Sequence, residues 1–284
     1  MQKVRPILYA YGAVVIWSAA YVATKIGLQY YDPISLSILR YLVAGIFAVT
    51  LVIVRHEHLP KRRDIPLFLL LGITGYSLYV LTYNLGAKDV SVSAASIIIS
   101  LAPISTAIGA SVIWAERLSA RQTVAALIEF AGAAIVCLSG DVLKAGNGML
   151  WIIASLLSFT AYNLLTRFAV EKYSAIQITE YGLIVALITF LPASPYAFLQ
   201  NEENSVAGLS SILFMGVICT GMAYILWSKA MESTDGTVNV TNALFLEPIV
   251  ATLLGIVVLK EYPSGWIWAG IAINCIGLWI FYGG

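Results

Sequence analysis

Apolar residues in this chain form long blocks, and most charged residues lie in the short stretches between them. Each block runs for about 20 residues, which is the length that an α-helix needs to cross the hydrocarbon core of a bilayer. The pattern predicts ten membrane-spanning helices, over residues 6–27, 33–54, 65–87, 91–114, 121–139, 147–169, 174–199, 205–228, 236–259 and 263–282. We therefore expect an all-α, polytopic membrane protein.

Two stretches of the chain are nearly the same segment written twice. Residues 101–135 align with residues 246–280 without a gap, at an offset of 145 positions, and nine of the 35 aligned pairs are identical. The identical pairs include a proline, a glutamate, a serine and a glycine from each segment: Pro103 and Pro248, Glu116 and Glu261, Ser119 and Ser264, Gly132 and Gly277. The match indicates a duplicated unit, which is how many transporters are built.

The helix count predicts how the two copies are oriented. The first copy takes residues 1–140 and the second takes residues 147–284, with five predicted helices each. The linker GDVLKAGNG, at 140–148, suits a turn outside the membrane. Because five is an odd number, the second copy enters the membrane from the opposite side. We expect two inverted five-helix repeats, related by an axis in the membrane plane.

Composition and charge agree with this topology. The chain is 60% hydrophobic and 11% charged, whereas soluble domains are about 25% charged. Its net charge of +1 gives no indication of nucleic acid as a partner. With a cytoplasmic N-terminus, inner loops would hold eleven Lys and Arg residues, at positions 3, 5, 55, 61, 62, 63, 117, 121, 167, 172 and 229. Outer loops would hold four, at positions 25, 88, 144 and 260. The positive-inside rule then predicts that both termini are cytoplasmic. We expect a multi-pass protein of a bacterial inner membrane, with the lipid bilayer as a partner.

One set of features occurs once in each half: a small-residue stretch leading into L-x-P-I, a glutamate thirteen residues after the proline, and an apolar helix with a glycine. The members are Ser91–Ile104, Glu116 and Gly132 in the first half, and Thr237–Ile249, Glu261 and Gly277 in the second. In these features the chain resembles the EamA-type family of the drug/metabolite transporter superfamily, over essentially its whole length. The resemblance implies ten helices in two five-helix repeats. It also implies a transporter that moves small metabolites, often amino acids outward, by alternating access.

The two repeated prolines lie in the middle of predicted helices. Pro103 and Pro248 each remove one backbone hydrogen bond and clash with the carbonyl four residues earlier. A membrane helix tolerates such a break where protein or a water-lined cavity satisfies the freed carbonyl. Recurrence at matched positions favours a pair of kinks that frame a central cavity, although a packing kink is the alternative.

Four ionisable residues lie deep in predicted helices: Arg40, Glu129, Glu180 and Glu247. A charge at mid-bilayer costs about 2.5–3.5 kcal/mol on insertion scales, so these side chains are expected to face the bundle interior. Glu247 lies closest to the midplane and is the first candidate for recognising a substrate ammonium. Together with Glu129 and Glu180 it is also a candidate for carrying a coupling proton. The alternative for each is an ion pair or hydrogen bond that fastens helices.

Aromatic, amide and hydroxyl residues within the helices are candidates for lining a solute cavity. They are Trp17, Tyr21, Tyr79, Tyr83, Asn84, Ser96, Tyr162, Asn163, Tyr224, Trp227, Asn239 and Asn242. Aromatic faces suit an apolar or aromatic solute, or cation–π contact with an amine. Aromatic belts at the membrane surface and hydrogen bonds between helices are the ordinary alternatives.

Glu116 and Glu261 are conspicuous, yet they fall at predicted helix ends. Each precedes a predicted N-cap serine, Ser119 or Ser264, by three residues. We therefore predict a structural role for these carboxylates, at the start of the next helix.

Several kinds of chemistry have no sequence support. There is no GxxxxGK[ST] loop to bind nucleotide phosphates and no Cys/His spacing typical of a metal site. We expect no enzyme activity, cofactor or metal. The predicted function is a secondary-active transporter that exports or exchanges a small polar metabolite, chiefly an amino acid or amine, as a monomer or homodimer. The alternatives are transport of a nucleotide-sugar or lipid-linked carrier, and a membrane enzyme.

Overall fold

The computed structural model describes residues 4–115, 119–138, 146–199, 205–231 and 246–282, which form helices joined by turns and short loops, without a strand. In chain order the elements are α1 Val4–Gly27, α2 Pro33–Val54, η1 Arg62–Asp64, α3 Ile65–Gly72, η2 Ile73–Leu78, α4 Tyr79–Ala87, α5 Val92–Ile99, α6 Ala102–Trp114, α7 Ala120–Cys137, α9 Gly148–Val170, α10 Ala175–Phe190, η3 Leu191–Ala193, α11 Ser194–Leu199, α12 Val206–Leu213, η4 Phe214–Met222, α13 Ala223–Met231, α15 Leu246–Leu254, η6 Gly255–Leu259 and α16 Gly265–Tyr282. The elements η2, η4 and η6 are π-helical, and η1 and η3 are 3-10 helices. The expectation of an all-α protein is confirmed.

Much of the chain is apolar enough to lie in a bilayer. Among the described residues, seven helical segments are long and apolar enough to cross a membrane: Pro33–Val54, Arg62–Ala87, Val92–Trp114, Ala120–Cys137, Gly148–Val170, Ala175–Leu199 and Val206–Trp227. Two shorter apolar helices are Leu246–Leu259 and Gly265–Phe281. Large apolar side chains such as Ile46, Leu157 and Trp279 are exposed on the bundle, as suits a surface that meets lipid rather than water. The protein is a multi-pass membrane protein.

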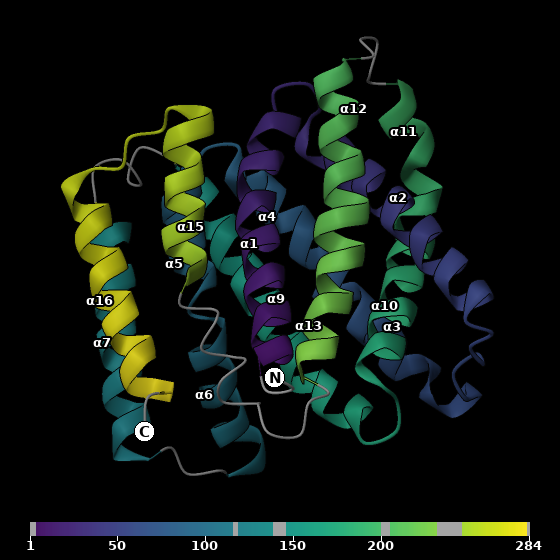
Figure 1. Cartoon of the computed structure of the whole chain (residues 1–284), viewed down its shortest axis with the longest axis horizontal. Coiled ribbons are helices and arrows are strands. Elements are labelled where there is room, and N and C mark those ends of the chain that lie inside the picture. The colour runs from purple at the N-terminus through teal and green to yellow at the C-terminus, as the bar shows by residue number, and fades with distance from the viewer. Residues whose placement is uncertain (1–3, 116–118, 139–145, 200–204, 232–245, 283–284) are drawn as a thin grey trace.

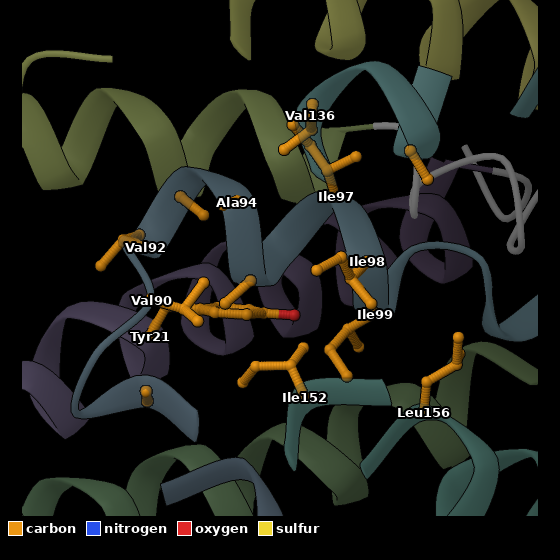
Figure 2. Packing of buried hydrophobic residues seen from close by; sticks show 14 of the residues in the cluster. Tyr21, Val90, Val92, Ala94, Ile97, Ile98, Ile99, Val136, Ile152 and Leu156 are labelled. Carbon is orange, nitrogen blue, oxygen red and sulfur yellow. The ribbon is translucent and has the colours of Figure 1, made fainter. Parts of the chain in front are cut away.

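The helices stand side by side in one bundle, and α1 begins at the same edge of the bundle at which α16 ends, at the bottom of Figure 1. The helix pairs in closest contact are α7 with α16, α2 with α10, α4 with α9, and α1 with α13 and α15. One core cluster joins Ile97 and Ile98 of α5 to Ile152 and Leu156 of α9, beside Tyr21 of α1 (Figure 2). These contacts hold together helices that are far apart in the sequence.

The predicted helix over 91–114 is broken at its proline. Helix α5 ends at Ile99, residues 100 and 101 form a turn, and α6 begins at Ala102 with Pro103 in its first turn. Proline is well accommodated there, because the first backbone N–H groups of a helix have no partner within the helix. The interruption leaves the side chain and backbone of Ser100 at a helix end in the middle of the bundle.

Close approach of α7 and α16 depends on glycine. A Cβ atom at Gly270 would lie 2.2 Å from Cγ2 of Val136, and one at Gly277 would lie 2.4 Å from Cγ of Glu129. Position 270 therefore meets 136 while position 277 meets 129, so the two helices run antiparallel. Small residues at such contacts let helix backbones come close enough for dense packing.

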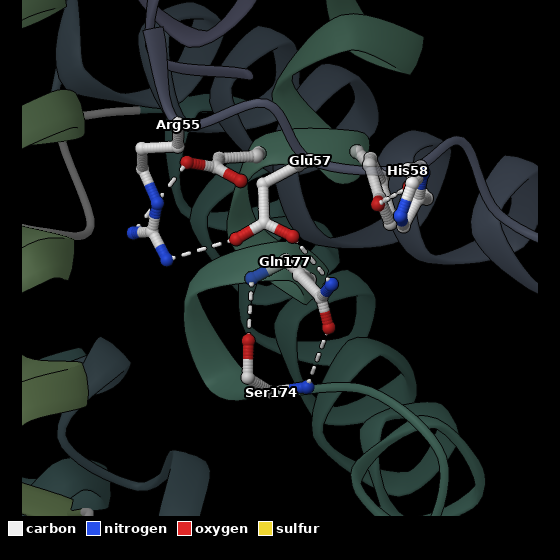
Figure 3. A network of polar contacts seen from close by, with 7 residues as sticks. Arg55, Glu57, His58, Ser174 and Gln177 are labelled. Atoms are coloured by element: carbon white, nitrogen blue, oxygen red, sulfur yellow. Dashed lines mark hydrogen bonds and ion pairs between the residues drawn. The ribbon is translucent and has the colours of Figure 1, made fainter. Parts of the chain in front are cut away.

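We name the two ends of the bundle after a residue at each: the Lys25 end and the Arg55 end. At the Arg55 end, the Glu57 carboxylate accepts hydrogen bonds from Nη2 of Arg55 at 2.9 Å and from Nε2 of Gln177 at 2.8 Å (Figure 3). Gln177 in turn forms a capping box with Ser174 at the start of α10. The loop after α2 is thereby fastened to the first turn of α10.

A second set of bonds at the Arg55 end holds η1. Asp64 accepts from Nζ of Lys172 and from the hydroxyl of Tyr173, each at 2.9 Å. The same tyrosine hydroxyl accepts from the backbone N–H of Lys61 at 3.1 Å. The loop between α9 and α10 therefore anchors the basic loop that precedes α3.

Candidate functional site

A cavity of about 200 Å³ lies among helices from both halves of the chain. It is bordered by α1, α2, α4, the break between α5 and α6, α9, η4, α13, α15 and α16. Its lining residues are Trp17, Ala20, Tyr21, Arg40, Tyr41, Tyr79, Tyr83, Ile99, Ser100, Ala102, Pro103, Phe159, Asn163, Cys219, Tyr224, Trp227, Glu247 and Leu278. We call this space the central cavity.

Glu247 brings a carboxyl group to the central cavity from the first turn of α15. Its Oε1 accepts a hydrogen bond from the hydroxyl of Tyr21 at 3.0 Å, and its backbone carbonyl accepts one from Oγ of Ser18 at 3.3 Å. Both partners belong to α1, so α1 orients this carboxyl. A carboxyl held by one tyrosine keeps acceptor capacity for a ligand cation.

Arg40 brings a guanidinium to the same cavity from α2, and the residue is only 8% exposed. Its Nε and Nη2 donate to Oγ1 of Thr220, at 3.2 and 3.0 Å. Thr220 belongs to the π-helical element η4 and donates in turn to the carbonyl of Met215, five residues earlier, at 2.7 Å. The π-helical register thus sets the position of the arginine's partner, and such elements are frequent at functional sites.

Aromatic rings form much of the wall between these two charged groups. The Trp17 ring packs against Tyr224 and Trp227, with 5.2 Å between ring centroids in each pair. The indole of Trp17 also donates to the carbonyl of Cys219 in η4 at 3.2 Å. One helical turn further along the same face of α1, Tyr21 meets Tyr83 edge-on, with 5.6 Å between ring centroids. The rings are fixed by one another and offer apolar faces to a solute.

Ten of the residues predicted from the sequence line this cavity: Trp17, Tyr21, Arg40, Tyr79, Tyr83, Pro103, Asn163, Tyr224, Trp227 and Glu247. Among them, Asn163 donates to Oγ1 of Thr106 at 3.2 Å and so connects α9 to α6 beyond the proline break. The structure brings these residues together from both halves.

Other predicted cavity residues lie in the helix packing. Asn84 donates to Oγ of Ser37 at 2.9 Å, and the Ser96 hydroxyl donates to the carbonyl of Ser93 in its own helix. Tyr162 lies beside Tyr76, with their hydroxyl oxygens 3.3 Å apart. Neither Asn84, Ser96 nor Tyr162 is among the residues that line the central cavity.

Glu129 and Glu180 lie away from the cavity in different surroundings. Glu129 is fully buried between α7 and α16, and within the described chain neither of its carboxyl oxygens has a hydrogen-bond partner. Glu180 lies near the Arg55 end, with its Oε1 3.8 Å from Nη1 of Arg55. Pro248 is buried in α15 next to Glu247. Asn239 and Asn242, predicted for the cavity wall, lie outside the described residues, as does Glu116.

The structure adds two residues that line the cavity, Ser100 and Phe159, and one that holds a lining residue in place, Thr220. Thr220 was missed because a lone threonine in an apolar run reads as packing, and the π-helical turn that aims it at Arg40 has no sequence signature. Ser100 lies on one helical face with Ser93 and Ser96 in the small-residue stretch before Pro103, and its hydroxyl donates to Oδ1 of Asn274 at 3.0 Å. Phe159 packs against Tyr79 with tilted rings whose centroids are 5.1 Å apart. Aromatic content alone did not distinguish Phe159 from the other aromatic residues of the helices.

Glu261 has a structural role, but at a different helix from the one predicted. Its Oε2 accepts from the backbone N–H of Val92 at 3.0 Å, so it caps the start of α5 in the other half of the chain. Its Oε1 lies 3.9 Å from Nζ of Lys25. Within the described part, Oγ of Ser264 has no hydrogen-bond partner. Glu261 therefore ties together the Lys25 ends of α1, α5 and η6.

Comparison with known proteins assigns the family. Two relatives match across nearly their whole length: a probable terminal-alkyne amino-acid exporter of Streptantibioticus cattleyicolor, 25% identical over 93% of this chain and 89% of its own, and an uncharacterized transporter of Archaeoglobus fulgidus, 28% identical over 94% and 95%. A solved structure described as the crystal structure of a protein has the same fold, with a TM-score of 0.68 and 19% identity over 97% of this chain and 96% of that one. The model of the EamA-like transporter family matches residues 4–138 and again residues 146–283. This protein therefore belongs to the EamA-like transporter family.

Proposed function

We propose that this protein is a secondary-active transporter of the bacterial inner membrane that exports or exchanges small polar metabolites, chiefly amino acids or amines, by alternating access. The observation that carries the proposal is the Glu247 carboxyl in a cavity walled by aromatic rings. A carboxylate binds an ammonium group through charge-assisted hydrogen bonds, and Trp and Tyr faces add cation–π attraction. The amino-acid export named for the Streptantibioticus relative agrees with this class.

The size of the central cavity supports a small solute over the larger alternatives. Sites for drug-sized ligands typically enclose about 300–1,000 Å³, whereas this cavity encloses about 200 Å³. A nucleotide-sugar or lipid-linked carrier would also need several cations for its phosphates, whereas Arg40 is the one cation among the described residues that line this cavity. One amino acid or amine matches both the volume and the charge.

Duplication supports alternating access between two symmetric states. The family model matches the chain twice, and α7 packs antiparallel on α16, which is its counterpart at the repeat offset. Ala115 and Lys260, which are 145 positions apart, both have left-handed backbone conformations, with φ of 54° and 58°. Inverted repeats that exchange conformations give one site access to each side of the membrane in turn. The excess of Lys and Arg at the Arg55 end supports a cytoplasmic location for that end and for both termini.

Flux into liposomes tests the proposed function. Purified protein is reconstituted, and uptake of a radiolabelled panel of amino acids and amines is measured. Replacing Glu247 with Gln is expected to reduce flux about tenfold or more, because the charge that binds the ammonium is lost. The matched control is Glu171→Gln, which makes the same change at an exposed residue that ends α9. Absence of flux for the whole panel would contradict transport, and equal flux in Glu247→Gln would contradict the role of this carboxyl.

We further propose the proton as coupling ion, carried by one or more of Glu247, Glu129 and Glu180. The burial of Glu129 and Glu180, whose carboxyl oxygens have no hydrogen-bond partner among the described residues, and the position of the Glu247 carboxyl in the central cavity support this. Uptake driven by an imposed pH gradient is measured for the three single Glu→Gln variants and for the triple variant. The triple variant is expected to lose the dependence on the gradient. Unaltered pH-driven uptake in that variant would exclude coupling through these groups.

A further inference from the structure

The central cavity carries both signs of charge, and the two are fixed by different helices. Glu247 of α15 is held by Tyr21 of α1, whereas Arg40 of α2 is held by Thr220 of η4. An amine substrate would use only the first of these sites. The second site therefore requires an explanation beyond ammonium recognition.

Arg40 is bonded in a way that leaves it available to an anion. A guanidinium has five N–H donors. Among the described residues it donates through Nε and Nη2 to a single neutral hydroxyl, that of Thr220, and its Cζ lies over the Tyr41 ring, 5.7 Å from the centroid. A buried charge in a membrane protein is costly unless an opposite charge or several hydrogen bonds compensate it. The guanidinium also faces the cavity, and its planar fork matches the two oxygens of a carboxylate.

Two tyrosine rings line the same cavity as the two charged groups. Tyr79 and Tyr83 lie in the wall of the central cavity, to which Arg40 and Glu247 also contribute. Both rings line the cavity and stack on each other, with 6.3 Å between centroids. A solute that lies along these rings therefore meets the cation and the carboxyl together.

We propose that Arg40, positioned by Thr220, binds the carboxylate of the transported solute while Glu247 binds its ammonium group, so that the site selects zwitterions with an apolar or aromatic side chain over simple amines. This inference rests on the proposed transport function and narrows its substrate class. The competing interpretation is that Arg40 only fastens α2 to η4. The two interpretations differ in whether the effect of replacing Arg40 on solute binding depends on the charge of the solute.

Three solutes that share one side chain but differ in charge provide the test: phenylalanine, phenethylamine and 3-phenylpropanoate. Binding is measured as the thermal shift of the purified full chain, and transport as uptake into liposomes. For the unmodified protein we expect phenylalanine to bind at least about tenfold more tightly than either single-charge analogue, because each analogue leaves one buried charge without a partner. The leucine, 3-methylbutylamine and 4-methylpentanoate series repeats the comparison for an aliphatic side chain.

Variants then assign each charge. Arg40→Gln is expected to weaken the binding of phenylalanine about tenfold or more while leaving the binding of phenethylamine unchanged. Glu247→Gln is expected to leave the binding of 3-phenylpropanoate unchanged. If Arg40→Gln does not fold, Thr220→Val keeps the guanidinium but removes its acceptor, and is expected to raise the KM of the amino acid more than that of the amine. Equal binding of phenylalanine and phenethylamine to the unmodified protein, or equal losses for both in Arg40→Gln, would overturn the inference. If the protein transports other solutes but no zwitterion, the inference is overturned while the proposed transport function stands. If no solute is transported, the proposed function itself is contradicted.

Discussion

Glu129 of α7 packs directly against Gly277 of α16, so that a Cβ atom at position 277 would lie only 2.4 Å from the Glu129 Cγ. The counterparts of these residues at the repeat offset of 145 are Asn274 and Gly132, and they also meet: a Cβ at Gly132 would lie 3.3 Å from the backbone nitrogen of Asn274. One contact is thus made twice across the interface of α7 and α16. Glycine at both positions lets the two helices approach closely.

The first prediction concerns this interface. Gly277→Ala is expected to destabilise the protein by about 1–3 kcal/mol, because the added methyl overpacks a contact with backbone atoms of α7. The loss is read as a lower midpoint of thermal unfolding in detergent. Gly265→Ala is the control, since nothing lies within 4 Å of a Cβ there. Equal midpoints for the two variants would mean that α7 can shift away from α16 at little cost.

A second prediction concerns the cap of α5. Glu261→Ala removes the acceptor of the Val92 N–H and is expected to cost about 0.5–2 kcal/mol. Glu261→Gln keeps an oxygen acceptor but loses the charge beside Lys25, so its cost should be smaller. Hydrogen exchange at the first turn of α5 is the measurement, and exchange should quicken in the order native, Gln, Ala. Unchanged exchange in Glu261→Ala would show that Ser91, whose side chain also accepts from the start of α5, caps the helix alone.

The break between α5 and α6 gives a third prediction. Pro103→Ala restores a backbone N–H that can donate to the carbonyl of Ile99, and so favours one continuous helix. We expect a protein that is at least as stable but several-fold slower in transport, because a rigid helix would replace the joint beside the cavity. The measurements are the unfolding midpoint and liposome uptake, with Pro60→Ala in the loop after α2 as a control. Full transport activity in Pro103→Ala would remove the break from the mechanism.

The capping box at the start of α10 gives a fourth prediction. Ser174 accepts from the backbone N–H of Gln177 at 3.2 Å, and Ser174→Ala should cost about 1 kcal/mol. Loss of the box also frees Gln177, which bonds to Glu57, so the loop after α2 should become more accessible to protease. Ser210→Ala, at an exposed position within α12, is the control. A protease pattern identical to that of the control would show that Arg55 and Lys172 suffice to hold the loop.

Several features of the fold follow from local sequence. Apolar blocks of membrane-spanning length predicted helices such as Pro33–Val54, which the structure has with the same bounds. Asp32 before Pro33 marks its start, and Oδ1 of Asp32 accepts from the backbone N–H groups of Ile34 and Ser35. Pro103 likewise predicted a local distortion of the helix over 91–114, where the structure has a break between α5 and α6. These signals act within one or two helical turns, so they can be interpreted without knowing what packs around them.

The candidate site was only partly predictable, because the sequence reveals which residues are charged but not what packs around them. Membrane-embedded charges are rare enough that Arg40 and Glu247 stand out in sequence, and both line the cavity. Glu129 and Glu180 give the same signal, yet one packs on Gly277 and the other lies near Arg55. Burial cost predicts that a charge faces the interior, but does not distinguish a cavity from a helix contact.

By itself, the sequence determined an all-helical membrane protein, the duplicated segment and a short set of polar candidates, because apolar length, helix caps and repeated motifs are properties of contiguous residues. Only the tertiary structure decided which candidates share one cavity, that Thr220 holds Arg40, and that Glu261 caps a helix 169 residues away. These relationships depend on the rotation and depth at which separate helices meet. A π-helical turn or a glycine contact changes that rotation by a fraction of a turn, and no local pattern records it.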